Sequence, residues 1–386
     1  MSDFATLALP GETPVVERPE YTYLATDLRS GVRLGELPLG DVQYTETLND
    51  SGPLSATVDL ATPGLDAIPL TIPRRTALWV YRGNTIVWAG IIWSRSAHGR
   101  GLSIEAESFW SYLATRLVTV DTAAEDDDQL AAAQDIVQWA FDQPGGDIGV
   151  TVDTATTSGV NITQQLCRGY ELKQVSQIVA DLAATDTGFD FAIVPTIVAD
   201  LPTAEFRCFY PRRGRRASLS QVTFRFRPGS GGNLIDYTFA EDGNDSATTV
   251  YGLGSGDGED MIIAAGVRTA SIDAGYPLQE ATVTYRDNDS VPSVLALAQA
   301  EVDRRADTPT TWSLEVDPDD ITFPFGSWVL GDDVTLVIED DWRFPAGTNG
   351  EPGYSGPVRI TGQTVAVPDD GGPEKVTLKA AEAFGA

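Results

Sequence analysis

The sequence predicts a mainly β protein with an α/β insert, and three observations lead to that prediction. From Tyr21 onward, short runs of alternating side chains are separated by Gly, Asp, Asn and Pro, as in half-buried strands joined by tight turns. Near Asp126 the apolar spacing changes to that of helices, and short β-type runs return after residue 200. The chain has 386 residues, of which 42% are hydrophobic, so it is long and apolar enough to fold into two or three domains with a sizeable core.

The first β region is expected over residues 21–125, after an extended arm of residues 1–20 that carries Pro and Glu without periodicity. Its clearest element is a hairpin, in which Ala77–Arg82 and Thr85–Trp93 flank the turn Gly83-Asn84. Apolar, β-branched and aromatic runs around a two-residue turn are a strong hairpin signal. Closely spaced strands of this kind are typical of a small barrel or sandwich.

The α/β insert is expected over residues 126–200. The acidic run Asp126–Asp128 suits the first turn of a helix, because carboxylates are favoured at the positive end of the helix dipole. A second helix is predicted from Leu172 to Asp186, with Gly188 as its end and a strand from Phe189 to Val194 after it.

The rest of the chain returns to β-type patterns. Residues 201–290 are expected to form a β-rich linking region, and residues 291–386 a second β region with one helix at residues 294–306. The run Ser290–Ser293 supplies a cap and a first-turn proline for that helix.

The charge of the chain excludes several functions. Its 26 Lys and Arg against 56 Asp and Glu give a formal net charge of −30. Proteins that bind nucleic acids neutralise phosphates with cationic side chains, so specific nucleic-acid binding is not expected. An anionic membrane surface would repel the chain as well, and its start has no basic segment typical of a signal peptide. We expect neither a membrane partner nor export by such a signal.

Scarce residue types limit the chemistry that the chain can perform. The only histidine is His98, in a predicted hairpin turn, and the only cysteines are Cys167 and Cys208. A structural zinc site needs four such ligands, and a Ser-His-Asp triad needs an oriented histidine. We therefore predict no metal, no cofactor and no catalytic residue, and we expect both cysteines to be buried in a protein that folds in a reducing compartment.

Two glycine- or acid-rich patterns are interpreted as turns and loops. Gly252–Gly258 departs from the dinucleotide-binding spacing and is followed by carboxylates that would repel a phosphate, so it is expected to be a turn between strands. The acidic clusters lack the spacing of an EF-hand and are interpreted as solvated loops, with a calcium site left open as the alternative. These clusters are Asp126–Asp128, Asp257–Asp260, Asp287–Asp289, Asp317–Asp320 and Asp340-Asp341.

One segment opposes the overall charge. Seven arginines are expected to share a single hairpin with Pro211 and Gly214 near its tip. They form either a solvated turn or an interface with an acidic neighbour such as a second copy of the chain. These candidate interface residues are Arg207, Arg212, Arg213, Arg215, Arg216, Arg225 and Arg227.

Four pieces of the chain, in this order, resemble a known family, the tail hub or baseplate hub (minor tail) proteins of long-tailed phages. Leu78–Ile92 resembles the early hairpin of that family, and Val250–Gly256 resembles its central glycine-rich strand. Leu297–Arg305 followed by Trp312–Val316 is similar to its helix-then-strand unit. Leu330–Leu336 with Val358–Gly362 resembles the closing pair of strands of the family.

The resemblance implies two small β-barrels linked by the α/β insert, and a homotrimeric ring at the virion tail tip, assembled in the cytoplasm of the bacterial host. It implies a structural protein, not an enzyme, that joins the hexameric tail tube to a tip fibre or spike. The implied partners are the distal tail or tail tube protein, the fibre or spike protein and the C-terminus of the tape-measure protein, with DNA passing through without specific binding.

Two other functions remain open from the residues. The many carboxylates are compatible with a cell-wall glycan hydrolase, which needs a pair of them. Exposed tryptophans such as Trp88, Trp93 or Trp342 are compatible with a carbohydrate-binding β-module of a phage tail.

Overall fold

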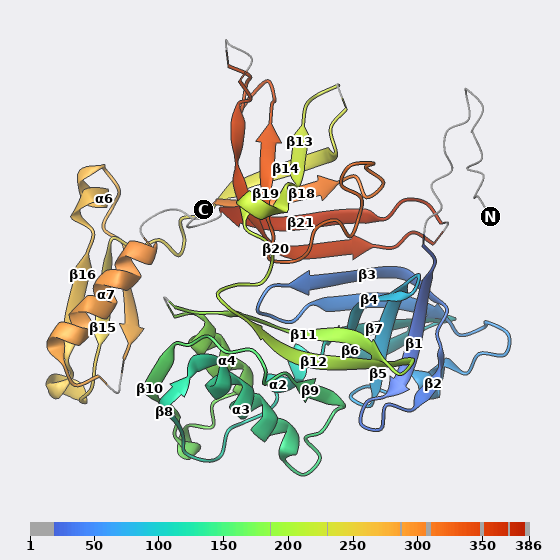
Figure 1. Cartoon of the computed structure of the whole chain (residues 1–386), viewed down its shortest axis with the longest axis horizontal. Helices are drawn as coiled ribbons and strands as arrows, with labels where there is room; N and C mark the ends of the chain where they lie inside the picture. The colour runs from blue at the N-terminus through green and yellow to red at the C-terminus, as the bar shows by residue number, and fades with distance from the viewer. Residues whose placement is uncertain are drawn as a thin grey trace, which may run out of the picture. The chain divides into compact units, whose positions relative to one another are not determined.

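The computed structural model describes residues 19–185, 187–229, 231–285, 288–305, 310–347, 351–369 and 371–382 (Figure 1). Nearly all of the expected arm at residues 1–20 lies outside this part of the chain. The chain divides into two compact units: unit 1 is Met1–Tyr237 with Leu314–Ala386, and unit 2 is Thr238–Ser313. The boundaries expected from the sequence between the arm, the two β regions, the insert and the linking region remain predictions.

A thirteen-stranded sheet forms the framework of unit 1. Its main path runs β14-β18-β21-β20-β3-β4-β7-β6-β5-β1-β2, with β19 joining β20 to β13. The strands are β1 (Tyr21–Asp27), β2 (Arg33–Glu36), β3 (Leu39–Thr47), β4 (Pro53–Asp59), β5 (Thr76–Arg82), β6 (Thr85–His98), β7 (Gly101–Ser108), β13 (Thr223–Phe226), β14 (Leu234–Glu241), β18 (Thr310–Val316), β19 (Asp333–Ile338), β20 (Tyr354–Ala366) and β21 (Lys375–Glu382).

The first and last β regions of the chain meet in this sheet. Strand β20 pairs antiparallel with β3, from Gly362 opposite Thr47 to Ala366 opposite Gln43 (Figure 1). The mainly β fold is confirmed, and so is the β5–β6 hairpin, which closes with Arg82 opposite Thr85. The resemblance implied closed barrels, but the sheets of the described residues are open. The two β regions join through β20 and β3, and the main path of the sheet ends at β14 and β2.

The insert consists of helices and small sheets that pack around an aromatic core. Trp110 contacts Phe191 and Phe206, with ring centroids 4.4 and 6.0 Å away. From here on, the insert means residues 110–209, which include the predicted insert at 126–200. Its elements are α2 (Trp110–Leu113), β8 (Thr122–Asp128), α3 (Gln129–Asp142), β9 (Val150–Val152), β10 (Asn161–Cys167), the 3-10 turn η1 (Gly169–Glu171), α4 (Val175–Ala183), β11 (Asp190–Val198) and β12 (Leu201–Phe209). The short helix α1 (Ala67–Leu70) lies between β4 and β5.

Both insert helices begin later than the sequence predicts. The acidic run at Asp126 ends strand β8, which pairs with β10, so its carboxylates are not in a first helical turn. Only Asp128 serves α3, as the N-cap whose carboxylate accepts a hydrogen bond from the Leu130 N–H at 2.8 Å. Helix α4 starts at Val175 because Leu172 has a left-handed backbone, with φ 52°.

Unit 2 is a three-stranded sheet, in the order β16-β15-β17, that one helix covers. Its elements are β15 (Thr249–Leu253), the 3-10 turn η2 (Gly258–Asp260), β16 (Ile263–Val267), α6 (Thr269–Asp273), β17 (Glu280–Thr284) and α7 (Val291–Arg305). Gly252 and Gly266 permit close packing, because a Cβ on either would lie 3.3 Å or less from α7. In the described part of the chain, no helix combines the length and apolar character needed to cross a bilayer.

Candidate functional site

The seven candidate interface arginines do not share a hairpin. Arg207 lies in β12, which pairs with β11 and β9, whereas Arg225 lies in β13, which pairs in parallel with β19. The segment between these strands carries the short helix α5 (Ala217–Ser220). The prediction of one hairpin is therefore wrong, because β12 pairs with β11 and β9, and β13 pairs with β19, instead of with each other.

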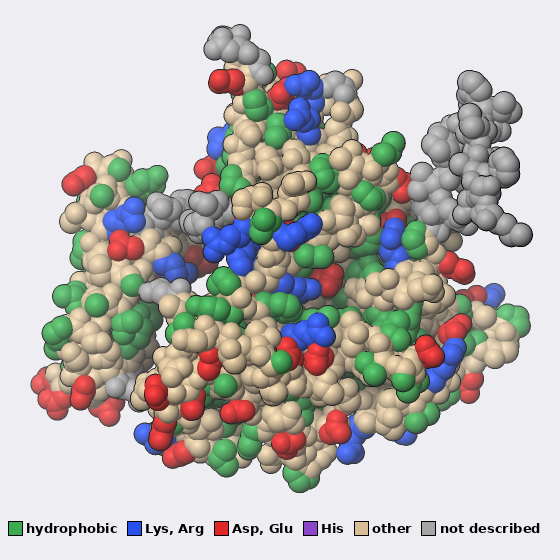
Figure 2. Space-filling view, in the orientation of Figure 1, with side chains coloured by type: hydrophobic (Ala, Val, Ile, Leu, Met, Phe, Trp, Pro, Cys, Tyr) green, Lys and Arg blue, Asp and Glu red, His purple; other side chains and the backbone are tan. Residues whose placement is uncertain are grey.

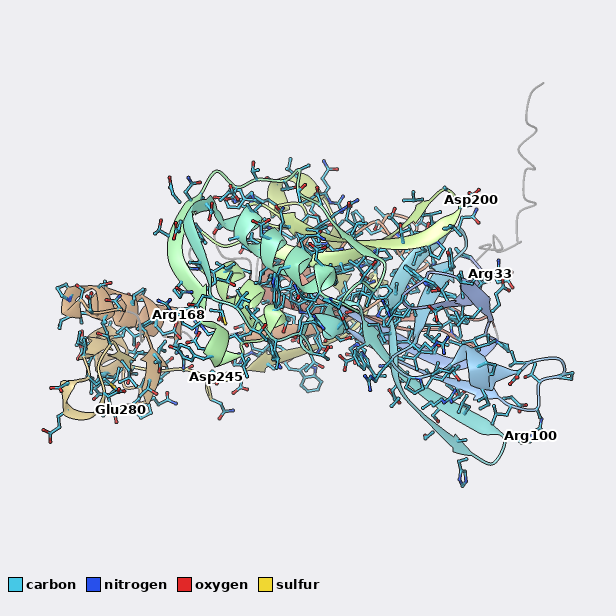
Figure 3. All side chains as sticks on the ribbon, turned by 90° about the horizontal axis from the view of Figure 1, so that it is seen from below. Arg33, Arg100, Arg168, Asp200, Asp245 and Glu280 are labelled. Atoms are coloured by element: carbon cyan, nitrogen blue, oxygen red, sulfur yellow. The ribbon has the colours of Figure 1, made fainter. Side chains whose placement is uncertain are left out.

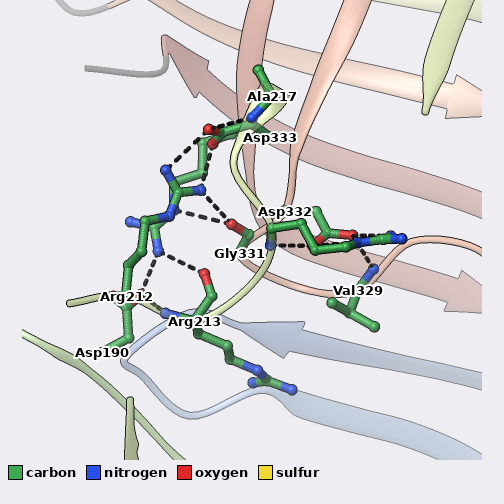
Figure 4. A network of polar contacts seen from close by, with 10 residues as sticks. Asp190, Arg212, Arg213, Ala217, Val329, Gly331, Asp332 and Asp333 are labelled. Atoms are coloured by element: carbon green, nitrogen blue, oxygen red, sulfur yellow. Dashed lines mark hydrogen bonds and ion pairs between the residues drawn. The ribbon is translucent and has the colours of Figure 1, made fainter. Parts of the chain in front are cut away.

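Two of these arginines bind buried carboxylates of their own chain (Figure 4). Arg212 pairs with Asp333, with Nη1 3.1 Å from Oδ2, and donates to the carbonyl of Gly331 at 2.7 Å. Arg215 donates to Asp332 from its backbone N–H at 2.6 Å and from Nε at 3.1 Å. The Asp332 and Asp333 side chains are 0% and 1% exposed, so these arginines supply the compensation that a buried carboxylate requires.

A third buried carboxylate, Asp190, links this network to the insert. It accepts hydrogen bonds from the backbone N–H of Arg213 at 2.6 Å and from Asn49 Nδ2 at 2.9 Å, and it pairs with Arg359. Asp190 begins β11, and Arg359 lies in β20. We name Arg212, Arg215 and Arg359 with Asp190, Asp332 and Asp333 the arginine–aspartate network; it fastens the insert and the segment after β12 to the last β region.

The other candidate arginines differ in their surroundings. Arg207 pairs with Glu205 at 2.5 Å, and Arg227 pairs with Glu339 at 2.6 Å. Arg213 lies over the Phe209 ring, 5.5 Å from its centroid. Arg216 and Arg225 are exposed. Figure 2 shows Lys and Arg side chains gathered in the middle of one face, with Asp and Glu spread over much of the rest. A role of the seven arginines in an interface stays a prediction.

A small cavity beside Arg213 contains a perturbed carboxyl group. The cavity has a volume of about 50 Å³ and is lined by Glu46, Trp88, Trp110 and Arg213, among others. Burial raises the pKa of Glu46, and the nearby charge of Arg213 lowers it by less. The volume is that of a few water molecules at most, so the cavity has no room for a substrate.

Two sequence interpretations are confirmed outside the network. His98 is exposed at the end of β6, where it pairs with Gly101 across the turn to β7. The glycine-rich run is the connection between antiparallel strands β15 and β16, and only the single 3-10 turn η2 follows Asp257. Neither segment has the form of a catalytic or phosphate-binding site.

Both cysteines are buried and free, as expected, with Cys167 0% and Cys208 2% exposed. Burial raises the pKa of the Cys208 thiol to about 12, so it is not a thiolate near neutral pH. Among the described residues, no group of three or more His, Cys, Asp and Glu is arranged to hold a metal ion.

Acidic clusters are used in the structure to cap turns. Asp340 accepts hydrogen bonds from the backbone N–H groups of Trp342, Arg343 and Phe344 at 2.8 to 2.9 Å. Asp320 accepts from Phe323 N–H at 2.6 Å in the same way. Asp287, in another predicted cluster, lies outside the described residues.

The carboxylates and tryptophans that suggested carbohydrate chemistry are mostly engaged. A cavity of about 650 Å³ is lined by Glu374 and Asp59, among others. Glu374 is paired with Arg82 at 2.7 Å, and hydrogen bonds from Ala61 N–H and Arg100 hold the pKa of Asp59 below its usual value. The indole N–H of Trp88 donates to the Thr45 carbonyl, and that of Trp93 to Ser111. Of the three candidate tryptophans, Trp342 alone is exposed, at 89%.

Sequence reasoning missed the acidic half of the network. Asp332 and Asp333 follow a glycine and precede an apolar strand, which is also the pattern of an ordinary solvated turn. Their partners lie more than 100 residues earlier in the chain. Single-sequence patterns do not reveal such long-range pairs.

Comparison with solved structures identifies the fold. A tail protein from Neisseria meningitidis is 14% identical, with a TM-score of 0.58, over 93% of this chain and 96% of that one. A prophage tail protein from Listeria monocytogenes (10% identity, TM-score 0.52) covers 95% of each chain. A 43 kDa tail protein of prophage MuSo2 from Shewanella oneidensis (10%, 0.54) covers 94% and 98%.

A chain of a Francisella PdpA–VgrG complex (11% identity, TM-score 0.53) matches 98% of this chain over 60% of its own length. No family model and no curated protein matches the sequence. The resemblance to tail hub proteins is confirmed in the fold, which this chain shares with these tail proteins and with the matched part of that complex.

Proposed function

We propose that this chain is a structural subunit of a phage tail tip, a homotrimeric hub ring that joins the hexameric tail tube to a distal fibre or spike. The observation that carries the proposal is the likeness to three tail proteins, which extends over more than nine tenths of each chain compared. A whole-chain likeness favours a common architecture over a single shared module.

Symmetry supports three copies. Each chain carries two β regions, so a trimer presents six quasi-equivalent units to a hexameric tube. The pairing of β20 with β3 holds the two regions of one copy in a single sheet, which gives each copy a fixed spacing between them. A closed ring of identical chains also satisfies the general rule that soluble homo-oligomers have point-group symmetry.

The net charge of −30 supports a passage for DNA. Carboxylates that line a channel repel phosphates, so DNA crosses it without adhering. In this proposal the ring contacts the distal tail or tail tube protein, the C-terminus of the tape-measure protein and the fibre or spike protein. It is located at the virion tail tip, assembles in the bacterial cytoplasm, and has no membrane partner.

We propose a structural role without catalysis or cofactor. The engaged state of Glu374, the lowered pKa of Asp59 and the single exposed tryptophan of the three candidates favour this role over glycan hydrolysis or sugar binding. Incubation of the purified protein with host cell-wall polysaccharide is expected to release no reducing ends. Release that is lost in Glu374→Gln would establish the enzymatic alternative.

Mass photometry and negative-stain microscopy test the assembly. Purified protein at micromolar concentration is expected to form particles of three times the chain mass of 41.3 kDa, with a central opening in projection. A monomer under these conditions would contradict the proposed trimeric hub.

A further inference from the structure

An apolar surface patch lies on the insert and includes no residue of the arginine–aspartate network. Tyr170 is 84% exposed, and Leu117, Val120 and Leu172 are 44%, 46% and 49% exposed. We name these four residues the loop patch. They come from two segments that contact each other, because the Val118 N–H donates to the Lys173 carbonyl at 2.9 Å and Leu117 bridges to Gln174.

The loop patch is held in place by hydrogen bonds. The Gly169 N–H donates to Asp121 Oδ1, and the Arg168 N–H donates to Glu171 Oε2, both at 2.8 Å. Figure 3 shows Arg168, at the start of this turn, at one edge of the insert. These bonds fix the backbone that carries Tyr170. An aromatic side chain has few rotatable bonds and loses little conformational freedom on binding, which is why tyrosine is common at the energetic centres of interfaces.

The backbone of Leu172 is strained in a way that presents this side chain outward. Its φ of 52° is in the left-handed region, which a bulky side chain rarely adopts and which is unfavourable for it. Glycine or asparagine would relieve this strain. The leucine is half exposed, so burial within its own chain compensates little of the cost.

The charges around the loop patch indicate its occupant. Arg116, Arg168 and Lys173 supply three cations, and Asp121 and Glu171 supply two anions, so the patch has a slight positive excess in a chain of net charge −30. Contact between two such chains is opposed by repulsion over most of their surfaces. At an apolar patch with a positive excess, an acidic second copy meets less repulsion than it does over the acidic surface.

We propose that the loop patch docks on a neighbouring copy of this chain, with Tyr170 and Leu172 as its anchors. The inference rests on the proposed trimeric ring and adds a contact that the ring needs. A ring of head-to-tail contacts uses two different surfaces per copy, and the loop patch is one of them.

The test compares variants of the full chain by mass photometry over a dilution series. Leu172→Asn removes the apolar anchor and suits the left-handed backbone, so the fold is retained; Tyr170→Ser removes the second anchor. Each is expected to raise the concentration at which half of the trimer has dissociated by about tenfold or more. Ile321→Asn is the matched control, because Ile321 is 97% exposed in another loop of unit 1, and it is expected to dissociate like the wild type.

The outcomes separate the two proposals. A wild-type monomer overturns the trimeric ring. A wild-type trimer whose dissociation is unchanged in both Leu172→Asn and Tyr170→Ser overturns the docking of the loop patch and leaves the ring intact. A photo-cross-linking amino acid at position 170 gives an independent measurement: a covalent dimer of this chain on a denaturing gel supports the contact, and its absence from an assembled trimer contradicts it.

Discussion

Replacing Asp333 by asparagine is expected to destabilise the chain more than the same change at Asp332, because their arginine partners differ in access to water. The Asp333 side chain is 1% exposed and its partner Arg212 is 15% exposed, so Asp333→Asn leaves a guanidinium buried without a counter-charge. Breaking a buried ion pair in this way costs about 3–5 kcal/mol. Asp332 is 0% exposed, but water reaches its partner Arg215, which is 42% exposed. We expect Asp332→Asn to cost about 1.5–3 kcal/mol, the range for lost hydrogen bonds to a charged group.

A surface pair provides the matched control. Arg227 is 45% exposed, and water screens its pair with Glu339, so Glu339→Gln is expected to stay near the wild type. The double variant Arg212→Met with Asp333→Asn is expected to recover part of the loss, because no unpaired charge remains buried.

Urea unfolding, followed by tryptophan fluorescence at one fixed protein concentration, measures these free energies. The expected order of destabilisation is Asp333→Asn, then Asp332→Asn, then Glu339→Gln. If the free energy of unfolding of Asp333→Asn lies within about 1 kcal/mol of the wild-type value, the reasoning is refuted. Such a result would mean that Arg212 finds another partner or reaches water in the variant.

Three further predictions concern packing, pH and thiol reactivity. Gly266→Ala places a Cβ 2.4 Å from the backbone of α7, so hydrogen exchange is expected to accelerate in unit 2 and not in unit 1; equal rates in the variant and the wild type would contradict the close packing. Hydrogen bonds from Ser30, with a smaller contribution from Arg75, lower the pKa of Asp27 from 3.8 to about 2. The ionised Asp27 therefore stabilises the folded chain above about pH 4, and this stabilisation is lost as the pH falls toward about 2. In Asp27→Asn the urea midpoint is expected to fall less over that pH range than in the wild type. Cys167 and Cys208 are expected to resist a thiol reagent in native protein and to react in urea, and rapid native labelling would show that these sites open.

Local patterns predicted the elements whose partners are near in sequence. The β5–β6 hairpin follows from two apolar runs around Gly83-Asn84, and the glycine-rich run after Thr249 is the turn that its composition indicates. The start of α3 differs from the predicted one because the acidic residues after Glu125 suit both a helical first turn and a strand. Pairing with β10, a segment more than thirty residues later, decides between them.

Long-range pairing determined what the sequence did not reveal. Proximity in the sequence predicts one hairpin for Arg207 and Arg225, yet β13 pairs in parallel with β19, from Thr223 opposite Thr335. Arg212 and Arg215 are likewise more than 100 residues from Asp333 and Asp332 in the sequence. The arginine-rich composition of this segment is visible in the sequence, but whether a given arginine binds its own chain depends on the tertiary fold.

Unit 2 begins and ends at two neighbouring strands, and this arrangement makes it an exchangeable module. Strand β14 leads into unit 2, strand β18 leads out of it, and the two are hydrogen-bonded neighbours in the large sheet. Neighbouring strands lie about 5 Å apart, so a short turn can close the sheet where the module is excised. Insertion, loss or replacement of the segment between these strands leaves the pairing of β20 with β3 untouched. Such a chain can acquire a new accessory part by recombination while the framework that carries it keeps its register.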